Sequence, residues 1–265
     1  MEWATFEKVV NLYMFDKNLR SILLDAIERI EVALRCRIVY EYSHSHGSHW
    51  YENAALFNRG THVKFMETMT RELGNSKETF ISHYKKKYTN PVNPPSWMSM
   101  EVLALGQLSK MYKNLKKGSA KKAVATYFGV GIPILESWME HLAYIRNLCA
   151  HHNRVWNRTM TVTATLPSLP SYMWINQHPS KTNKIYTTIC IVAYMLNRVT
   201  NRPTFAGEIK VLLKRYNNID IHAAGFSFEW EKDNFWKSTQ IILTHKIRIV
   251  FFKCRNKLTN YRHVI

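Results

Sequence analysis

Acidic residues are scarce in this chain of 265 residues. It contains 19 Asp and Glu against 37 Lys and Arg, which gives a formal net charge of +18 and a pI near 9.8. Hydrophobic residues make up 46% of the chain, so it can bury a substantial core in one large domain or two small ones. The excess of positive charge predicts attraction to polyanions, which are nucleic acids or anionic membrane surfaces.

Long hydrophobic runs and paired cysteines are also missing. The most apolar stretch, Ile185 to Leu196, is shorter than the roughly 20 residues that a membrane-spanning helix needs. The first residues show no basic segment followed by an apolar core, so no secretory signal is visible. The four cysteines are far apart, which is typical of reduced thiols and not of a disulfide frame or zinc site: Cys36, Cys149, Cys190 and Cys254. We therefore expect a cytoplasmic protein without a membrane partner.

Two long windows of the sequence contain no carboxylate at all. Residues 102–135 and 141–207 have neither Asp nor Glu, although both windows are rich in Lys and Arg. Magnesium sites for phosphoryl chemistry are built from carboxylates, and glycosidases need a pair of them. The sequence therefore disfavours both kinds of enzyme around these windows, and we expect no metal and no other cofactor.

Glycine and proline are few, and neither occurs between Thr5 and Ser43. Apolar residues recur there at intervals of three and four, which predicts one long amphipathic helix. The same reasoning predicts further helices over 61–88 (with a break near Gly74), 97–115, 134–151, 184–199 and 204–216. Thr159 to Leu166 is the one stretch with strand-like composition. The expected fold is mostly α, with a long first helix and little or no β.

The chain is expected to divide into a main helical domain and a C-terminal basic extension. The domain covers residues 1–200, and the extension covers residues 201–265. Residues 235–265 contain seven Lys or Arg and no acid. The sequence leaves two alternatives open for this extension, which are a basic helix packed on the core and a partly disordered tail.

The best candidate for chemistry is the segment from Arg146 to His151, near the end of a predicted helix. Asn147 and His151 are four residues apart and share a helix face, and Arg146 has no carboxylate three or four residues away. A histidine can act as general acid or base, which typically contributes about 10²–10⁴-fold in rate. An arginine can stabilise the charge of a pentacoordinate phosphorane. Together these groups suit cleavage of RNA by its own 2′-hydroxyl, which DNA lacks.

A second interpretation is binding of a polyanion without chemistry. A histidine near a helix C-terminus is often only a favourable charge beside the helix dipole. The cations predicted to contact RNA phosphates, instead of forming solvated faces, are Lys113, Lys116, Lys117, Lys121, Lys122, Arg154 and Arg158. Two other groups have alternatives that stay open. Base stacking competes with core packing for Tyr40, Tyr42, Trp50 and Tyr51, and metal binding competes with simple exposure to solvent for His44, His46 and His49.

Several stretches resemble one known family. The segment Arg146 to Arg158 resembles the signature of the AbiD/AbiF (Abi-like) group of bacterial abortive-infection proteins, which belongs to the HEPN superfamily. Leu12 to Arg20 and Ala26 to Arg35 are similar to the group's first long helix. Pro94 to Leu103, continued by Gly106 to Ser109, is similar to its middle helix. These matches follow the group's order and cover most of residues 6–160. The similarity fades after about residue 201, and members usually carry a further segment before the first helix.

The resemblance implies a HEPN-type helical bundle that forms a homodimer, with two R-x(4–6)-H motifs meeting across the interface. Carried over by position, Arg146 and His151 are the catalytic pair, and Asn147 is the polar residue that follows the arginine. The implied activity is that of a metal-independent endoribonuclease, a toxin that arrests growth during phage defence. The implied partners are RNA and either an antitoxin or a small regulatory RNA. The alternative is a non-catalytic HEPN protein that docks a specific small RNA.

Overall fold

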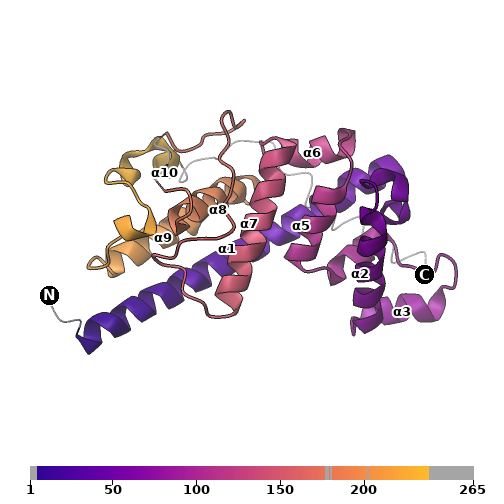
Figure 1. The fold of residues 1–265 in the computed structure, drawn as a ribbon, viewed down its shortest axis with the longest axis horizontal. Helices are drawn as coiled ribbons and strands as arrows, with labels where there is room; N and C mark the ends of the chain where they lie inside the picture. The colour runs from indigo at the N-terminus through magenta and orange to yellow at the C-terminus, as the bar shows by residue number, and fades with distance from the viewer. Residues whose placement is uncertain (1–4, 177–178, 180, 202, 239–265) are drawn as a thin grey trace.

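The computed structural model describes residues 5–176, 179, 181–201 and 203–238 (Figure 1). The helices of this part of the chain are α1 (Phe6–His46), α2 (Thr61–Asn75), α3 (Thr79–Lys87), α4 (Ser96–Ser99), α5 (Leu105–Asn114), α6 (Ser119–Tyr127), α7 (Ile132–Ala150), α8 (Ile185–Val199), α9 (Phe205–Arg215) and α10 (Asn234–Ser238). No strand forms among the described residues, so the expectation of a mostly α fold is confirmed.

Helix α1 is the axis on which the other helices are assembled. Its 41 residues begin after Thr5, whose hydroxyl accepts a hydrogen bond from the Lys8 amide, and end before the cap residue Gly47. Gly47 has a φ of 83°, a conformation that favours glycine, and its amide bonds the Ser43 carbonyl. One face of α1 is buried under α6, α7, α8 and α9, and α7 crosses it near its middle (Figure 1).

Helix α7 packs against α5 and α1 through the apolar stripe that the sequence predicts. The members of that stripe are at most 1% exposed: Leu135, Trp138, Met139, Leu142, Ile145 and Cys149. The Trp138 ring also packs on Trp174 and Tyr194, with centroids 5.7 and 5.4 Å away. The burial of so many large side chains fixes the rotation of α7 about its axis.

The strand-like stretch Thr159 to Leu166 does not form a strand. It runs along α7 and pairs its backbone with side chains of that helix. The Trp138 indole donates to the Thr165 carbonyl at 2.9 Å, and the Thr165 amide donates to the Ser137 hydroxyl at 2.9 Å. The partners that a strand would find in a neighbouring strand are supplied here by a helix.

The helices differ from the sequence-based expectation at two places. The predicted helix over 97–115 is interrupted, because the Gln107 side chain caps the Ala104 amide at 2.8 Å and starts α5 afresh. The sequence predicted only a lysine-rich break around Gly118 before the helix over 134–151, whereas the structure has an additional helix, α6, directly after that glycine. The expected break near Gly74 is confirmed, since α2 ends at Asn75 and α3 begins at Thr79.

The described part of residues 201–238 packs on the same core. Helix α9 lies against α1 and α8, and the buried Trp236 indole donates to the Tyr186 hydroxyl at 3.1 Å. Residues 239–265, where the sequence left two alternatives open, lie outside the described residues. Among the helices that are described, none combines the length and the apolar character needed to cross a membrane.

Candidate active site at the end of α7

The motif segment occupies the last turn and the C-terminal cap of α7. The helix ends at Ala150, and His151 is its cap residue. The His152 amide bonds the Cys149 carbonyl at 3.1 Å, and the Asn153 amide bonds the Leu148 carbonyl at 2.9 Å. This pattern is a Schellman cap, which normally has glycine where His152 stands with a φ of 58°. The cap places the two consecutive histidines in different backbone conformations.

The three predicted catalytic side chains are exposed at this end of the molecule. Arg146, Asn147 and His151 face solvent, whereas the intervening Leu148 and Cys149 are buried. Among the described residues, no hydrogen bond or ion pair holds any of the three exposed side chains. At about 100° per residue, Asn147 lies 100° from Arg146 around the helix, and His151 lies about 140° from it. All three are therefore available to a ligand, but the two ends of the motif diverge.

A carboxylate from α1 lies beside the motif although none is near in sequence. Asp16 is 4% exposed, and its Oδ1 accepts the amides of Val155 at 3.0 Å and Trp156 at 2.7 Å. Its other oxygen pairs with the buried Arg20. The loop that follows His151 is thereby tied to α1. Sequence reasoning missed this role, although an aspartate beside Phe15 on the apolar face of a helix was a signal for it.

Tyr144 is a second residue that sequence reasoning missed. It precedes Asn147 by three residues and His151 by seven, so all three share one side of α7. Burial alone raises the pKa of this phenol, but Thr161 and Arg158 beside the hydroxyl outweigh it and lower the pKa. Arg158, one of the predicted RNA-binding residues, is half-buried here. The spacing of seven residues was visible in the sequence.

The lysines predicted to contact phosphate differ in exposure and in their partners. Lys116, Lys117 and Lys122 are exposed, and so is Arg154 after the motif. Lys113 is half-exposed and pairs with Glu140 at 2.8 Å.

Lys121 is a correction to the sequence-based prediction. Its side chain is 2% exposed, and its ammonium lies 2.6 Å from both the Glu136 carboxylate and the Leu115 carbonyl. Because those partners neutralise and enclose the charge, Lys121 is not available to a phosphate. It ties α6 to the C-terminal end of α5 instead.

The lysines and the motif lie at opposite ends of α7. Lys116, Lys117 and Lys122 belong to α6 and the turn before it, and α6 leads into the first residue of α7 (Figure 1). The 19 residues of α7 span about 27 Å at 1.5 Å per residue. Of the predicted RNA-binding cations, only Arg154 and Arg158 follow the motif closely in sequence.

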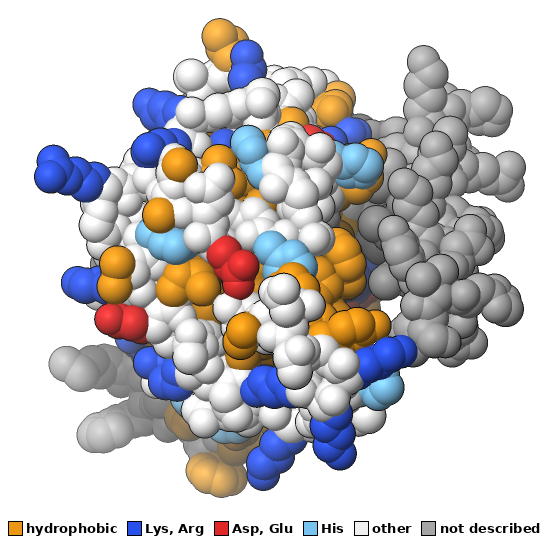
Figure 2. Space-filling view, turned by 90° about the vertical axis from the view of Figure 1, so that its right-hand side faces the viewer, with side chains coloured by type: hydrophobic (Ala, Val, Ile, Leu, Met, Phe, Trp, Pro, Cys, Tyr) orange, Lys and Arg blue, Asp and Glu red, His pale blue; other side chains and the backbone are white. Residues whose placement is uncertain are grey.

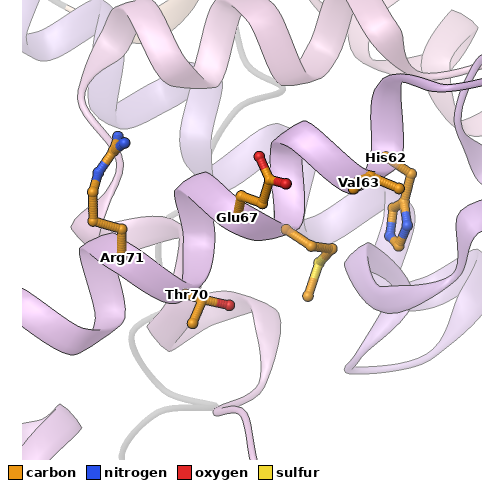
Figure 3. Close-up of a pocket in the computed structure, with 6 residues that line it drawn as sticks. His62, Val63, Glu67, Thr70 and Arg71 are labelled. Carbon is orange, nitrogen blue, oxygen red and sulfur yellow. The ribbon is translucent and has the colours of Figure 1, made fainter.

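A hollow lies along α2, far in sequence from the motif and from the predicted RNA-binding cations. It measures about 690 Å³ and is lined by His62, Val63, Met66, Glu67, Thr70 and Arg71, all from one helix (Figure 3). The His62 ring already bonds the Tyr51 carbonyl at 3.0 Å. The space-filling view of this side of the molecule shows hydrophobic, basic and histidine side chains intermixed (Figure 2). The hollow contains none of the predicted site residues.

The histidine cluster at the end of α1 has structural roles. The His49 ring lies 3.1 Å from the Asn93 carbonyl and 3.0 Å from the Ser48 hydroxyl, and the His44 ring packs on Tyr40 at 4.4 Å. Within the ranges that the structure describes, no three His, Cys, Asp or Glu side chains are grouped so that they could hold a metal ion.

Comparison with known proteins gives one match. Residues 1–157 fit the family described as Abi-like protein, a range that includes both Asp16 and the motif from Arg146 to His151. No curated protein and no solved structure matches the chain. The matched range covers more than half of the 265 residues and follows the order of the stretches that carried the resemblance. The chain therefore belongs to the Abi-like protein family, which associates it with abortive infection, a defence of bacteria against phage.

Proposed function

We propose that this chain is a metal-independent endoribonuclease of the HEPN type, acting as a toxin in abortive infection. The observation that carries the proposal is the state of Arg146 and His151. Both are exposed at the end of a firmly packed helix, and neither has a partner among the described residues. Side chains held by a rigid element but left without internal bonds are available for a substrate.

In the proposed reaction, the RNA supplies its own nucleophile. A histidine removes the proton of a 2′-hydroxyl, and the 2′-oxygen attacks the adjacent phosphorus. The bond from phosphorus to the 5′-oxygen breaks, and that oxygen receives a proton from a second acid. Arg146 stabilises the added negative charge of the phosphorane, and Asn147 donates a hydrogen bond to a phosphate oxygen. The products are a 2′,3′-cyclic phosphate and a 5′-hydroxyl, and DNA is spared because it lacks the 2′-hydroxyl.

Incubation of the purified protein with labelled single-stranded RNA in EDTA tests this chemistry. We expect cleavage without metal and fragments that end in cyclic phosphate. His151→Ala should lower the rate by about 10²–10⁴-fold, as loss of a general acid or base does. The neighbouring His152→Ala serves as the matched control and should cleave normally. A strict requirement for Mg²⁺, or cleavage of DNA, would rule the mechanism out.

The proposal includes a homodimer, because one copy does not aim the whole motif at one phosphate. Arg146 and His151 diverge by about 140° around α7. The first turns of α1, next to the Asp16 contact, expose a group of apolar side chains: Phe6, Val9, Val10, Tyr13 and Met14. An exposed apolar face of this kind favours association with another protein surface. A two-fold contact there would bring two copies of the motif together.

Mixing of two inactive variants tests the composite site. Arg146→Ala protein and His151→Ala protein should each be inactive, and their mixture should recover part of the activity. Each mixed dimer retains one Arg146 and one His151, so the recovery measures whether the two copies share a site. A wild-type protein that sediments as a monomer at the concentration of the assay, yet cleaves fully, would contradict the dimer.

Binding of RNA without cleavage is the second candidate function. It is favoured by the exposed Lys116, Lys117 and Lys122, which lie far from the motif and carry no internal ion pair among the described residues. Retention of RNA by wild-type protein and by His151→Ala protein, with no fragments from either, would select this candidate over the nuclease.

A further inference from the structure

A smaller hollow lies between α1 and α6, beside the exposed lysines. It measures about 390 Å³, a size typical of sites for small ligands, and we call it the α1–α6 groove. Its lining comes from two helices that pack closely together: Arg37 from α1, and Ser119, Lys122, Ala123, Thr126 and Tyr127 from α6.

The groove carries positive charge. Arg37 and Lys122 line it, and its lining includes no carboxylate. One terminal nitrogen of Arg37 pairs with Glu41, but its Nε is buried without a hydrogen-bond partner among the described residues. Lys116 and Lys117 are exposed just ahead of Ser119 along the chain. An anion in the groove would therefore meet the exposed Lys122 ammonium, and Lys116 and Lys117 add positive charge just before α6.

Two aromatic rings lie against Arg37. The Arg37 guanidinium lies 4.7 Å from the centroid of the Tyr127 ring and 5.3 Å from that of Tyr40. Tyr40 stands on α1 one turn beyond Arg37, and 41% of its surface is exposed. Cations interleaved with exposed aromatic rings are the combination with which proteins bind single-stranded nucleic acid, because a base stacks on the ring while the phosphate meets the cation.

We propose that the α1–α6 groove binds a nucleotide of single-stranded RNA, with its base stacked on Tyr40 and its phosphate beside Lys122. This inference rests on the proposed function, in which RNA is the substrate. Because the groove is lined by α1 and α6 alone, whereas the motif lies at the C-terminal end of α7, the groove contributes to affinity and takes no part in the chemistry. An acidic protein would use the cations equally well, but it would gain little from the exposed ring.

Binding of a short labelled single-stranded DNA tests the groove apart from cleavage, since this probe lacks the 2′-hydroxyl. We expect Lys122→Glu and Tyr40→Leu each to weaken binding about tenfold, and Lys122→Glu also to flatten the salt dependence. Tyr40→Phe retains the ring and should bind normally. Lys64→Glu on α2 and Tyr88→Leu at the end of α3 are matched exposed controls and should have no effect. With RNA of the same sequence, the groove variants should raise KM and leave kcat unchanged.

Four results would decide the proposal, and the last of them distinguishes failure of the groove from failure of the proposed nuclease. Normal binding by both groove variants would overturn the groove. Weaker binding by Lys122→Glu alone would overturn the stacking and indicate a surface that responds only to charge, as an acidic protein would use. A free nucleoside monophosphate that competes as well as the strand would overturn the assignment to a polynucleotide. Groove-dependent binding with no RNA cleavage would support the groove and reject the proposed nuclease.

Discussion

Two histidines ten residues apart, His141 within α7 and His151 at its C-terminal cap, have opposite surroundings. His141 is 1% exposed, its Nδ1 donates to the Val162 carbonyl at 2.7 Å, and its Nε2 accepts from the Thr188 hydroxyl at 2.8 Å. His151 is exposed, and no described residue bonds its ring. The same side chain on the same helix therefore serves the packing of the fold at one position and is left available for a substrate at the other.

The comparison shows that partners, and not residue type, distinguish a structural group from a candidate catalytic one. The adjacent Lys121 and Lys122 repeat the contrast on α6, since the first is enclosed by Glu136 and the Leu115 carbonyl while the second faces solvent. Buried polar groups need such partners, because an unsatisfied one costs free energy. Substitutions that remove a partner of a buried polar group should therefore lower stability, and substitutions of the exposed groups should lower activity.

The largest stability effect should come from Asp16→Asn, which removes the charge that links α1 to the loop after the motif. The asparagine oxygen can still accept both amides of that loop, but the buried Arg20 loses its counter-charge. We expect the free energy of unfolding to fall by about 3–5 kcal/mol, as when one partner of a buried pair is removed. Urea denaturation measures the change.

Asp25→Asn is the matched control for Asp16→Asn. Asp25 pairs with Arg29 on the same helix at the same spacing of four residues, but this pair is exposed. Its loss should change the free energy of unfolding by about 0.5 kcal/mol or less. Equal effects of the two substitutions would show that burial does not decide the strength of these links.

A smaller loss of stability, about 2–3 kcal/mol, should follow His141→Ala. The change leaves a cavity and deprives the Val162 carbonyl and the Thr188 hydroxyl of their partner. Under the same urea titration, His151→Ala should be nearly neutral because its ring is exposed. Comparable losses at both positions would remove the distinction between the two histidines.

The smallest expected effect is a change in how the free energy of unfolding depends on pH. Burial lowers the pKa of His141 below the ordinary 6.5, because the interior disfavours the imidazolium. The unfolded chain therefore binds a proton more readily than the folded protein. This contribution to stability is complete above about pH 7, and it declines as the pH falls below 6.5. Unfolding measured from pH 8 to pH 5 should show a shallower decline for His141→Ala than for wild type. Identical slopes for the two proteins would mean that protonation of His141 does not contribute to the pH dependence of stability.

Much of the fold was predictable because it depends on local pattern. The absence of Gly and Pro between Thr5 and Ser43 predicted α1, which extends three residues further to His46. The apolar stripe of α7 was predicted member by member, and the motif at its end is exposed. Spacing in the sequence determines both features, because a regular helix converts spacing directly into a face.

The rest could not be predicted because it depends on contacts between distant residues. The carboxylate of Asp16 bonds the backbone amide of Val155, which lies 139 positions away in the sequence. The stretch around the motif contains no carboxylate in the sequence, but the fold brings this one beside it. Lys121 is buried because Glu136, on the next helix, supplies its counter-charge. The stretch Thr159 to Leu166 finds its hydrogen bonds on α7, which no periodicity of its own could reveal.

The bond between Asp16 and the loop after the motif has a consequence for synthesis on the ribosome. At about 5–20 residues per second, the 139 residues between Asp16 and Val155 take roughly 7–28 s to translate. Throughout that interval α1 exists without the loop that it holds. A nascent chain therefore has no assembled motif until more than half of the protein has been made, and a message cut before that point yields a fragment without it.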